Sequence, residues 1–188
     1  MNPNDAHRSS IGLVTARHIY TGKIVTLSVD QVRLPNGAVA ELEFIRHPGA
    51  AAVVPLTDDG QVIMIRQYRY AAGGFLYEIP AGKLHSGEDP RLCAERELEE
   101  EIGYRASTME LLTSILTTPG FTNEVIHIFL GTNLSKGIQQ LEHDEVLDVV
   151  TWPLETAIRR IQDGTIRDAK TIVGLQSVYI KRCLAASF

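Results

Sequence analysis

Four glutamates stand close together in the segment 96–101, which reads Arg-Glu-Leu-Glu-Glu-Glu. If this segment is helical, side chains three and four positions apart share a face, so Glu97, Glu100 and Glu101 project together. Carboxylates at this spacing repel one another, and a divalent cation would relieve the repulsion. Ligands that are all oxygen favour Mg²⁺ or Mn²⁺ over zinc. The run alone predicts either a solvent-exposed acidic helix face, which is its commoner meaning, or a magnesium site.

The helix that carries these glutamates is predicted between a glycine-rich loop and a glycine stop. Residues 71–87 include four glycines and are expected to be rich in loop structure. The helix should begin near residues 88–90, because proline suits the first turn and acidic residues there complement the helix dipole. It should run to about Ile102 and end at Gly103, a common residue after a helix. Its apolar stripe, which can pack on a sheet, is Ala94, Leu98 and Ile102.

Strands account for most of the remaining pattern. They are predicted at residues 24–34, 39–45, 50–56, 61–70, 109–116, 125–131 and 146–152, and further helices at 153–161 and 169–184. Asn36-Gly37 predicts a hairpin turn, and the unbroken apolar run 50–56 predicts a strand buried on both faces. Strands interleaved with a few helices favour an α+β fold or a layered α/β/α domain. We expect an N-terminal antiparallel β subdomain at 1–48 and the main domain at 49–188.

Composition excludes several classes of protein. The chain has 188 residues, enough for one domain with a substantial core. Its net charge of −5 argues against a general nucleic-acid binder, which needs a basic surface. The two cysteines are far apart, which fits a reducing cytoplasm, and no apolar run is long enough to span a bilayer. We expect a cytoplasmic protein with neither a nucleic-acid nor a membrane partner.

The residues from Gly82 to Tyr104 resemble the Nudix box. Gly82 is followed after five residues by Glu88 and, after seven more, by Arg-Glu-Leu-Glu-Glu-Glu-Ile-Gly-Tyr at 96–104. Every defining position matches, with a mild departure at Tyr104, because the last position is usually aliphatic. The resemblance implies a Nudix-like α/β/α fold and a hydrolase that cuts the diphosphate linkage of a nucleoside-diphosphate compound.

The resemblance also implies a role for each box residue. Glu97, Glu101 and in many members Glu100 hold Mg²⁺, for which Mn²⁺ can substitute, and the main-chain carbonyl of Ala81 often joins them. Such ions neutralise the diphosphate and lower the pKa of a bound water, which attacks phosphorus in line. Glu88 and Arg96 are implied to brace the loop against the helix. The supporting positions of the site are Gly82, Glu88, Arg96 and Gly103.

Three segments outside the helix resemble the branch of ADP-ribose pyrophosphatases and nucleoside-diphosphate-sugar hydrolases. They are Pro119, fifteen residues after Tyr104, the lead-in 78–82 and the tail 164–171. This branch implies hydrolysis of ADP-ribose to AMP and ribose 5-phosphate, with another nucleoside-diphosphate sugar such as GDP-mannose as the alternative substrate. A Nudix module that binds a nucleotide metabolite without cutting it is the alternative from another class. The intact box glutamates favour catalysis.

The general base in this branch comes from a mobile loop rather than from the box helix. Glu142 in the acidic loop 142–145 fits that place best, Glu145 is the alternative, and Glu100 is a further catalytic candidate. Arginine can bind phosphate through two parallel hydrogen bonds, so Arg69 is predicted to contact the substrate. The branch also exchanges N-terminal strands between two subunits, which implies a homodimer. Further candidates for substrate binding are Arg46, Glu43 and Phe121.

Overall fold

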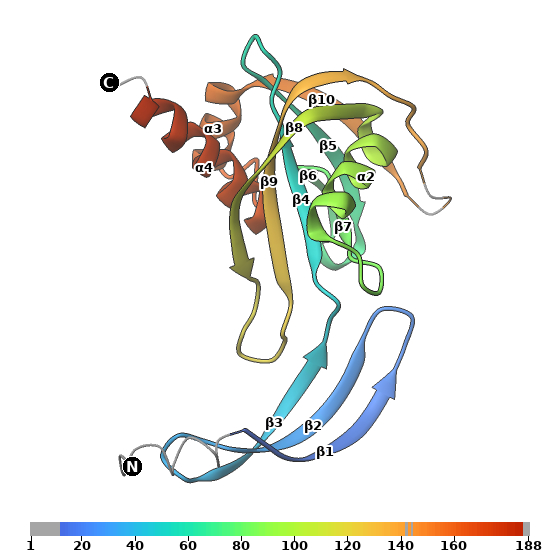
Figure 1. Ribbon diagram of the computed structural model, residues 1–188, viewed down its shortest axis with the longest axis vertical. Helices are drawn as coiled ribbons and strands as arrows, with labels where there is room; N and C mark the ends of the chain where they lie inside the picture. Colours follow the sequence, from blue (N-terminus) through green and yellow to red (C-terminus); the bar gives the residue numbers. More distant parts are fainter. Residues whose placement is uncertain (1–11, 142, 144, 186–188) are drawn as a thin grey trace. The chain divides into compact units, whose positions relative to one another are not determined.

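The computed structural model describes residues 12–141, 143 and 145–185 (Figure 1). The chain forms two compact units. The first consists of Met1–Pro48 and Leu116–Glu124, and the second of Gly49–Ile115 and Val125–Phe188. The loop 116–124, with Pro119 and Phe121, therefore belongs with the N-terminal strands.

The first unit is an antiparallel sheet of three strands in the order β1-β2-β3. These strands are β1 (Gly12–Thr21), β2 (Thr26–Arg33) and β3 (Val39–Arg46). The predicted hairpin turn is confirmed, because Gly37 has a φ of 84° and the side chain of Asn36 accepts a hydrogen bond from the N–H of Ala38. The loop 116–124 joins this sheet through the N–H of Ile45, which donates to the carbonyl of Phe121 at 2.7 Å. Strand β1 was not predicted, since nearly all its side chains are exposed and its sequence lacks alternation.

The second unit holds two further sheets. One has the order β10-β5-β6 and the other β7-β4-β9-β8, in which β4 and β9 run parallel. Their strands are β4 (Ala50–Pro55), β5 (Gln61–Arg69), β6 (Gly74–Glu78), β7 (Ala81–Lys83), β8 (Tyr104–Leu116), β9 (Val125–Lys136) and β10 (Leu147–Pro153). Within the loop-rich segment 71–87, the strands β6 and β7 were not predicted, because these short strands add to the edges of β5 and β4.

Besides the single 3-10 turn Tyr70–Ala72, the described part of the second unit has three α-helices, and the sequence predicts the ends of each α-helix to within about two residues. They are α2 (Pro90–Ile102), α3 (Leu154–Gln162) and α4 (Ala169–Ala185). Asp89 caps the first turn of α2, where its side chain accepts a hydrogen bond from the N–H of Arg91. Gly103 ends the helix with a φ of 68°, a conformation that glycine adopts without strain. Within the described part of the chain, no helix combines the length and apolar character needed to cross a bilayer.

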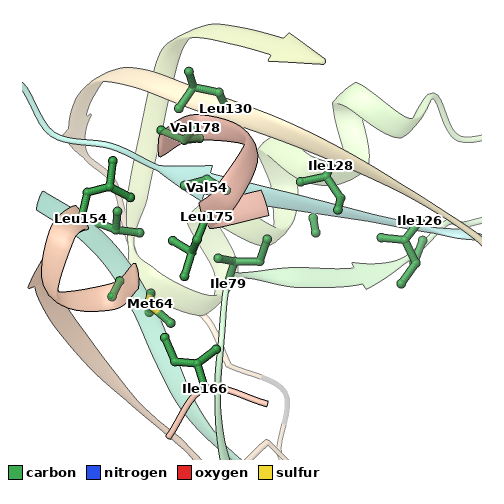
Figure 2. Close-up of a cluster of buried hydrophobic side chains, with 14 residues drawn as sticks. Val54, Met64, Ile79, Ile126, Ile128, Leu130, Leu154, Ile166, Leu175 and Val178 are labelled. Carbon is green, nitrogen blue, oxygen red and sulfur yellow. The ribbon is translucent and has the colours of Figure 1, made fainter. Parts of the chain in front are cut away.

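Strand β4 divides the second unit into layers, because its side chains alternate between two cores. Ala51 and Val53 pack with the apolar residues of α2, including Leu98. Ala52 and Val54 pack on the opposite side with α3 and α4. Figure 2 shows this second core, where Val54 lies among Leu175, Val178 and Ile128. Both faces of the strand are thus buried, as its unbroken apolar run predicts, and the α+β class with an α/β/α sandwich is confirmed.

Candidate active site

The three candidate metal-binding glutamates lie on α2, and two of them, Glu97 and Glu101, lie against β7. Glu97 is 8% exposed and Glu101 only 2%, whereas Glu100 is partly exposed. A carboxylate that merely solubilises a helix would be in water, so the burial of Glu97 and Glu101 contradicts the reading as an acidic surface face. Buried charges require partners or a cation. Glu101 finds one partner in the N–H of Ala81, which donates to its Oε2 at 3.0 Å.

Burial and neighbouring negative charges raise the pKa of both carboxyl groups. Burial raises the pKa of Glu101 well above its ordinary value, and the charge of Glu97 raises it further. Burial also raises the pKa of Glu97, while the neighbouring guanidinium of Arg96 opposes that effect. Both carboxylates would gain from a cation, because a positive charge stabilises their ionised forms.

Gly82 leaves the space that the Glu97 carboxylate occupies. A Cβ placed on Gly82 would lie 1.7 Å from Oε1 of Glu97 and 2.1 Å from its Cδ, far closer than any real contact. The φ of Gly82 is outside the left-handed region, so close approach of the side chain, not backbone conformation, requires glycine here. Ala81 and Gly82 of β7 therefore lie directly against the buried glutamates.

Arg96 connects the loop before α2 with the glutamates on it. Its Nε donates to Oε1 of Glu88 at 3.1 Å, and its Nη1 donates to Glu97 at 2.6 Å and to Glu100 at 2.8 Å. Nη2 reaches the carbonyl of Lys83 at 3.3 Å. Glu88 in turn accepts the N–H of His85 at 2.8 Å. This geometry matches the bracing implied for Arg96 and Glu88, and it adds direct contacts between Arg96 and two carboxylates.

The donor set suits a hard cation that is only partly enclosed by protein. Among the residues that the structure describes, no three acidic, histidine or thiol side chains converge into a complete cage. Mg²⁺ is commonly held by one or two carboxylates, with water and substrate phosphates as the other ligands. The carboxylates of Glu97 and Glu101 beside the main chain of Ala81 fit this pattern.

Of the two loop glutamates predicted as the general base, only Glu145 lies among the described residues. Glu142 lies outside the described residues. Glu145 is half-buried, and its negative charge adds to the effects that raise the pKa of Glu97 and of Glu101. Glu145 is therefore close enough to interact electrostatically with both buried carboxylates.

Arg69 lines a pocket of about 380 Å³. Its Nε and Nη2 donate to the two oxygens of Glu78 at 2.8 and 2.9 Å. Lys170 also binds Glu78 and pairs with Asp168 at 3.1 Å. Sequence reasoning singled out the segments that contain Glu78 and Lys170 but assigned neither residue to the site. Their pairing joins positions 92 apart, and no local pattern predicts it.

The other predicted substrate contacts belong to the first unit. Arg46 pairs with the buried Asp30 at 2.8 Å, also binds Ser28, and lies 5.0 Å from the ring centre of Phe44. Phe121 is 48% exposed. Glu43 is opposite Val29 in the sheet. The box residues thus gather in the second unit, and a substrate role for these three stays a prediction.

Comparison with known proteins agrees with this geometry. The NUDIX domain model matches residues 46–173. The methanol dehydrogenase activator of Bacillus methanolicus is 42% identical over 91% of this chain and 94% of its own. The ADP-ribose pyrophosphatase of Bacillus subtilis (strain 168) is 40% identical over 92% and 95%. In fold, the crystal structure of an ADP compounds hydrolase matches with a TM-score of 0.80 at 21% identity, over 95% and 96% of the two chains. The chain belongs to the NUDIX domain family.

Proposed function

We propose that this protein hydrolyses the diphosphate linkage of ADP-ribose to AMP and ribose 5-phosphate, with Mg²⁺ as its cofactor. The observation that carries the proposal is the buried pair Glu97 and Glu101 against β7. Members of the NUDIX family generally depend on a divalent metal. The substrate is inferred from the ADP-ribose pyrophosphatase of Bacillus subtilis, to which nearly the whole chain is similar.

Glu97, Glu101 and the carbonyl of Ala81 would hold the metal, with Glu100 at the exposed edge. When bound, Mg²⁺ supplies charge neutralisation of the diphosphate and a water of lowered pKa. Arg96 keeps Glu97 and Glu100 oriented through its hydrogen bonds. Because Gly82 has no side chain, the Glu97 carboxylate can lie against the main chain of β7.

The chemical step is an in-line substitution at phosphorus. The oxygen of water forms a bond to one phosphorus, the bond from that phosphorus to the bridging oxygen breaks, and the other phosphate leaves. The proton of the water passes to a carboxylate that acts as general base. Glu142 remains our first choice for this base and Glu145 the second. The electrostatic effect of Glu145 on Glu97 and Glu101 supports the second choice.

Arg69 is proposed to contact the substrate beside this site. Glu78 fixes its guanidinium through two hydrogen bonds, which leaves Nη1 to interact in the pocket. Arg46, Glu43 and Phe121 are proposed as contacts from the N-terminal unit.

A homodimer would account for the exposed apolar residues of the first unit. Large apolar side chains that gather on the surface of a small sheet mark a site of interaction with another protein surface. The apolar side chains of this sheet that are at least 41% exposed are Leu13, Val14, Ile19, Tyr20, Val39 and Leu42. We propose that a second copy of the chain covers them, and that the dimer works in the cytoplasm. Light scattering after size exclusion measures the mass directly, and a monomer at micromolar concentration would refute the dimer.

A matched pair of variants tests the catalytic proposal. Purified protein is incubated with Mg²⁺ and ADP-ribose, and the products are separated by ion exchange. The wild type should release AMP and ribose 5-phosphate, and E97Q should lose at least about 100-fold in kcat. E99Q is the control, because Glu99 lies on the same helix but pairs with Arg105 away from the site. Cleavage of GDP-mannose in preference to ADP-ribose would favour the alternative substrate. Tight binding of ADP-ribose without cleavage would favour a binding module.

A further inference from the structure

The pocket beside Arg69 has walls of two kinds. Apolar side chains come from the single turn 70–72 and from β6, and charged side chains come from β5, β6 and the start of α4. The apolar members are Ala71, Ala72 and Leu76, and the charged members are Arg69, Glu78, Asp168 and Lys170. Two cations and two carboxylates cancel, so the pocket carries no net charge to attract a phosphate group.

Most polar atoms of these four residues are already used. Glu78, only 1% exposed, accepts from Arg69 through both oxygens and from Lys170. Lys170 is 10% exposed and divides its charge between Glu78 and Asp168. These contacts hold the side chains rigidly, but they leave Glu78 and Lys170 little capacity to bind a ligand.

Two polar groups retain capacity at the pocket. Oδ2 of Asp168 accepts from the N–H of Thr171 at 3.0 Å and from its hydroxyl at 2.6 Å, and it forms an ion pair with Lys170 at 3.1 Å. Oδ1 of Asp168 and Nη1 of Arg69 make no hydrogen bond within residues 12–141, 143 and 145–185. A fixed acceptor and a fixed donor beside an apolar wall match a sugar ring, whose hydroxyls both donate and accept.

The pocket is also within reach of the diphosphate. Glu78 precedes Ala81 by three residues, so their Cα atoms are separated by at most about 10 Å. The hydrogen bond with Glu78 is the main cause that raises the pKa of Arg69, but the charge of Glu101 contributes as well. A sugar attached directly to a phosphate at the metal site would therefore extend to this pocket.

We propose that this pocket binds the sugar of the leaving sugar phosphate, and that Asp168 determines specificity by accepting a sugar hydroxyl. The inference rests on the proposed function, because it assumes that the diphosphate lies at Glu97 and Glu101.

The test compares two substrates that differ only in the sugar. ADP-ribose carries the hydroxyls of its terminal ribose. The methyl ester of ADP has the same nucleoside and diphosphate, but a methyl group in place of that ribose. D168N retains an oxygen that can cap α4, but it presents an amide donor where the carboxylate presents an acceptor. D163N is the matched control, since Asp163 also caps a backbone N–H, that of Thr165, outside the pocket.

D168N should lower kcat/KM for ADP-ribose by about 10- to 100-fold, mainly through KM, because a hydroxyl loses its acceptor. For the methyl ester, D168N should change kcat/KM by less than about threefold. D163N should leave kcat/KM unchanged for both substrates. Equal losses on both substrates, or no loss on ADP-ribose, would overturn the proposal. D168S, which retains a capping hydroxyl, repeats the test if D168N unfolds.

A failure of the proposed function can be recognised separately. If the wild type cleaves neither compound, the hydrolase proposal fails, and binding of the two compounds is measured by calorimetry instead. Tighter binding of ADP-ribose than of the methyl ester, lost in D168N, would support the pocket. Equal binding of both compounds by the wild type would refute it.

Discussion

Replacing Gly82 by alanine should inactivate the enzyme while leaving it folded. The new methyl carbon would lie 1.7 Å from Oε1 of Glu97, and an ordinary contact is about 3.4 Å, so the carboxylate must move by well over 1 Å. A misplacement of about 1 Å in a reacting constellation can cost 100-fold in rate, or roughly 3 kcal/mol. Gly82 has no left-handed φ, and the group that must move is the end of a flexible side chain. We therefore expect stability to change by about 1 kcal/mol or less.

The assay for G82A is kcat/KM with ADP-ribose over a Mg²⁺ titration, together with thermal unfolding. The loss of about 100-fold should come with a higher Mg²⁺ concentration at half activity, because Glu97 no longer reaches the metal. G137A is the control. A Cβ on Gly137 would lie 2.8 Å from Oε1 of Glu99, so it also displaces a glutamate of α2, but one that pairs with Arg105 away from the site. If G82A had the same kcat/KM and the same Mg²⁺ dependence as G137A, the reasoning would be refuted.

Two further predictions concern buried carboxylates. E101Q should lower kcat by about 1,000-fold or more, yet stabilise the metal-free protein by about 1 kcal/mol at pH 8 in urea unfolding with EDTA. The reason is that burial and Glu97 raise the pKa of Glu101, so its ionisation opposes folding; a destabilised E101Q would contradict this. Burial by itself raises the pKa of Glu78, but Arg69 and Lys170 outweigh it and lower the pKa, so its ionised form stabilises the fold. E78Q should therefore lose about 3 kcal/mol at pH 7. The difference from wild type should shrink as pH falls below about 4.3 and through the lowered pKa, and a constant difference down to pH 2 would exclude this role.

The helix at the centre of the site could be predicted because its signals are local. Asp89 and Pro90 begin α2, Gly103 ends it, and the spacing of glutamates fixes which of them share a face. The burial of β4 could be predicted in the same way, since an apolar run of that length has no polar face to expose.

The missed features depend on contacts between distant parts of the chain. Strands β6 and β7 exist because β5 and β4 offer free edges, and nothing in their own sequences requires extension. Glu78 becomes part of a charged pocket only because Lys170 is folded against it. The burial of Glu101 follows from the position of Ala81, twenty residues earlier in the chain. Periodicity within a single element carries no information about such neighbours.

The hydroxyl of Thr171 accepts the N–H of Ile79 at 2.9 Å, and this bond has a consequence for biosynthesis. Ile79 directly follows Glu78, whose second positively charged partner is Lys170. A growing polypeptide that has not yet produced residues 168–171 has neither partner for this segment. The wall of the pocket is therefore completed by residues that are translated well after the glutamate helix, and a chain that stops before residue 168 should remain inert even though it contains that whole helix.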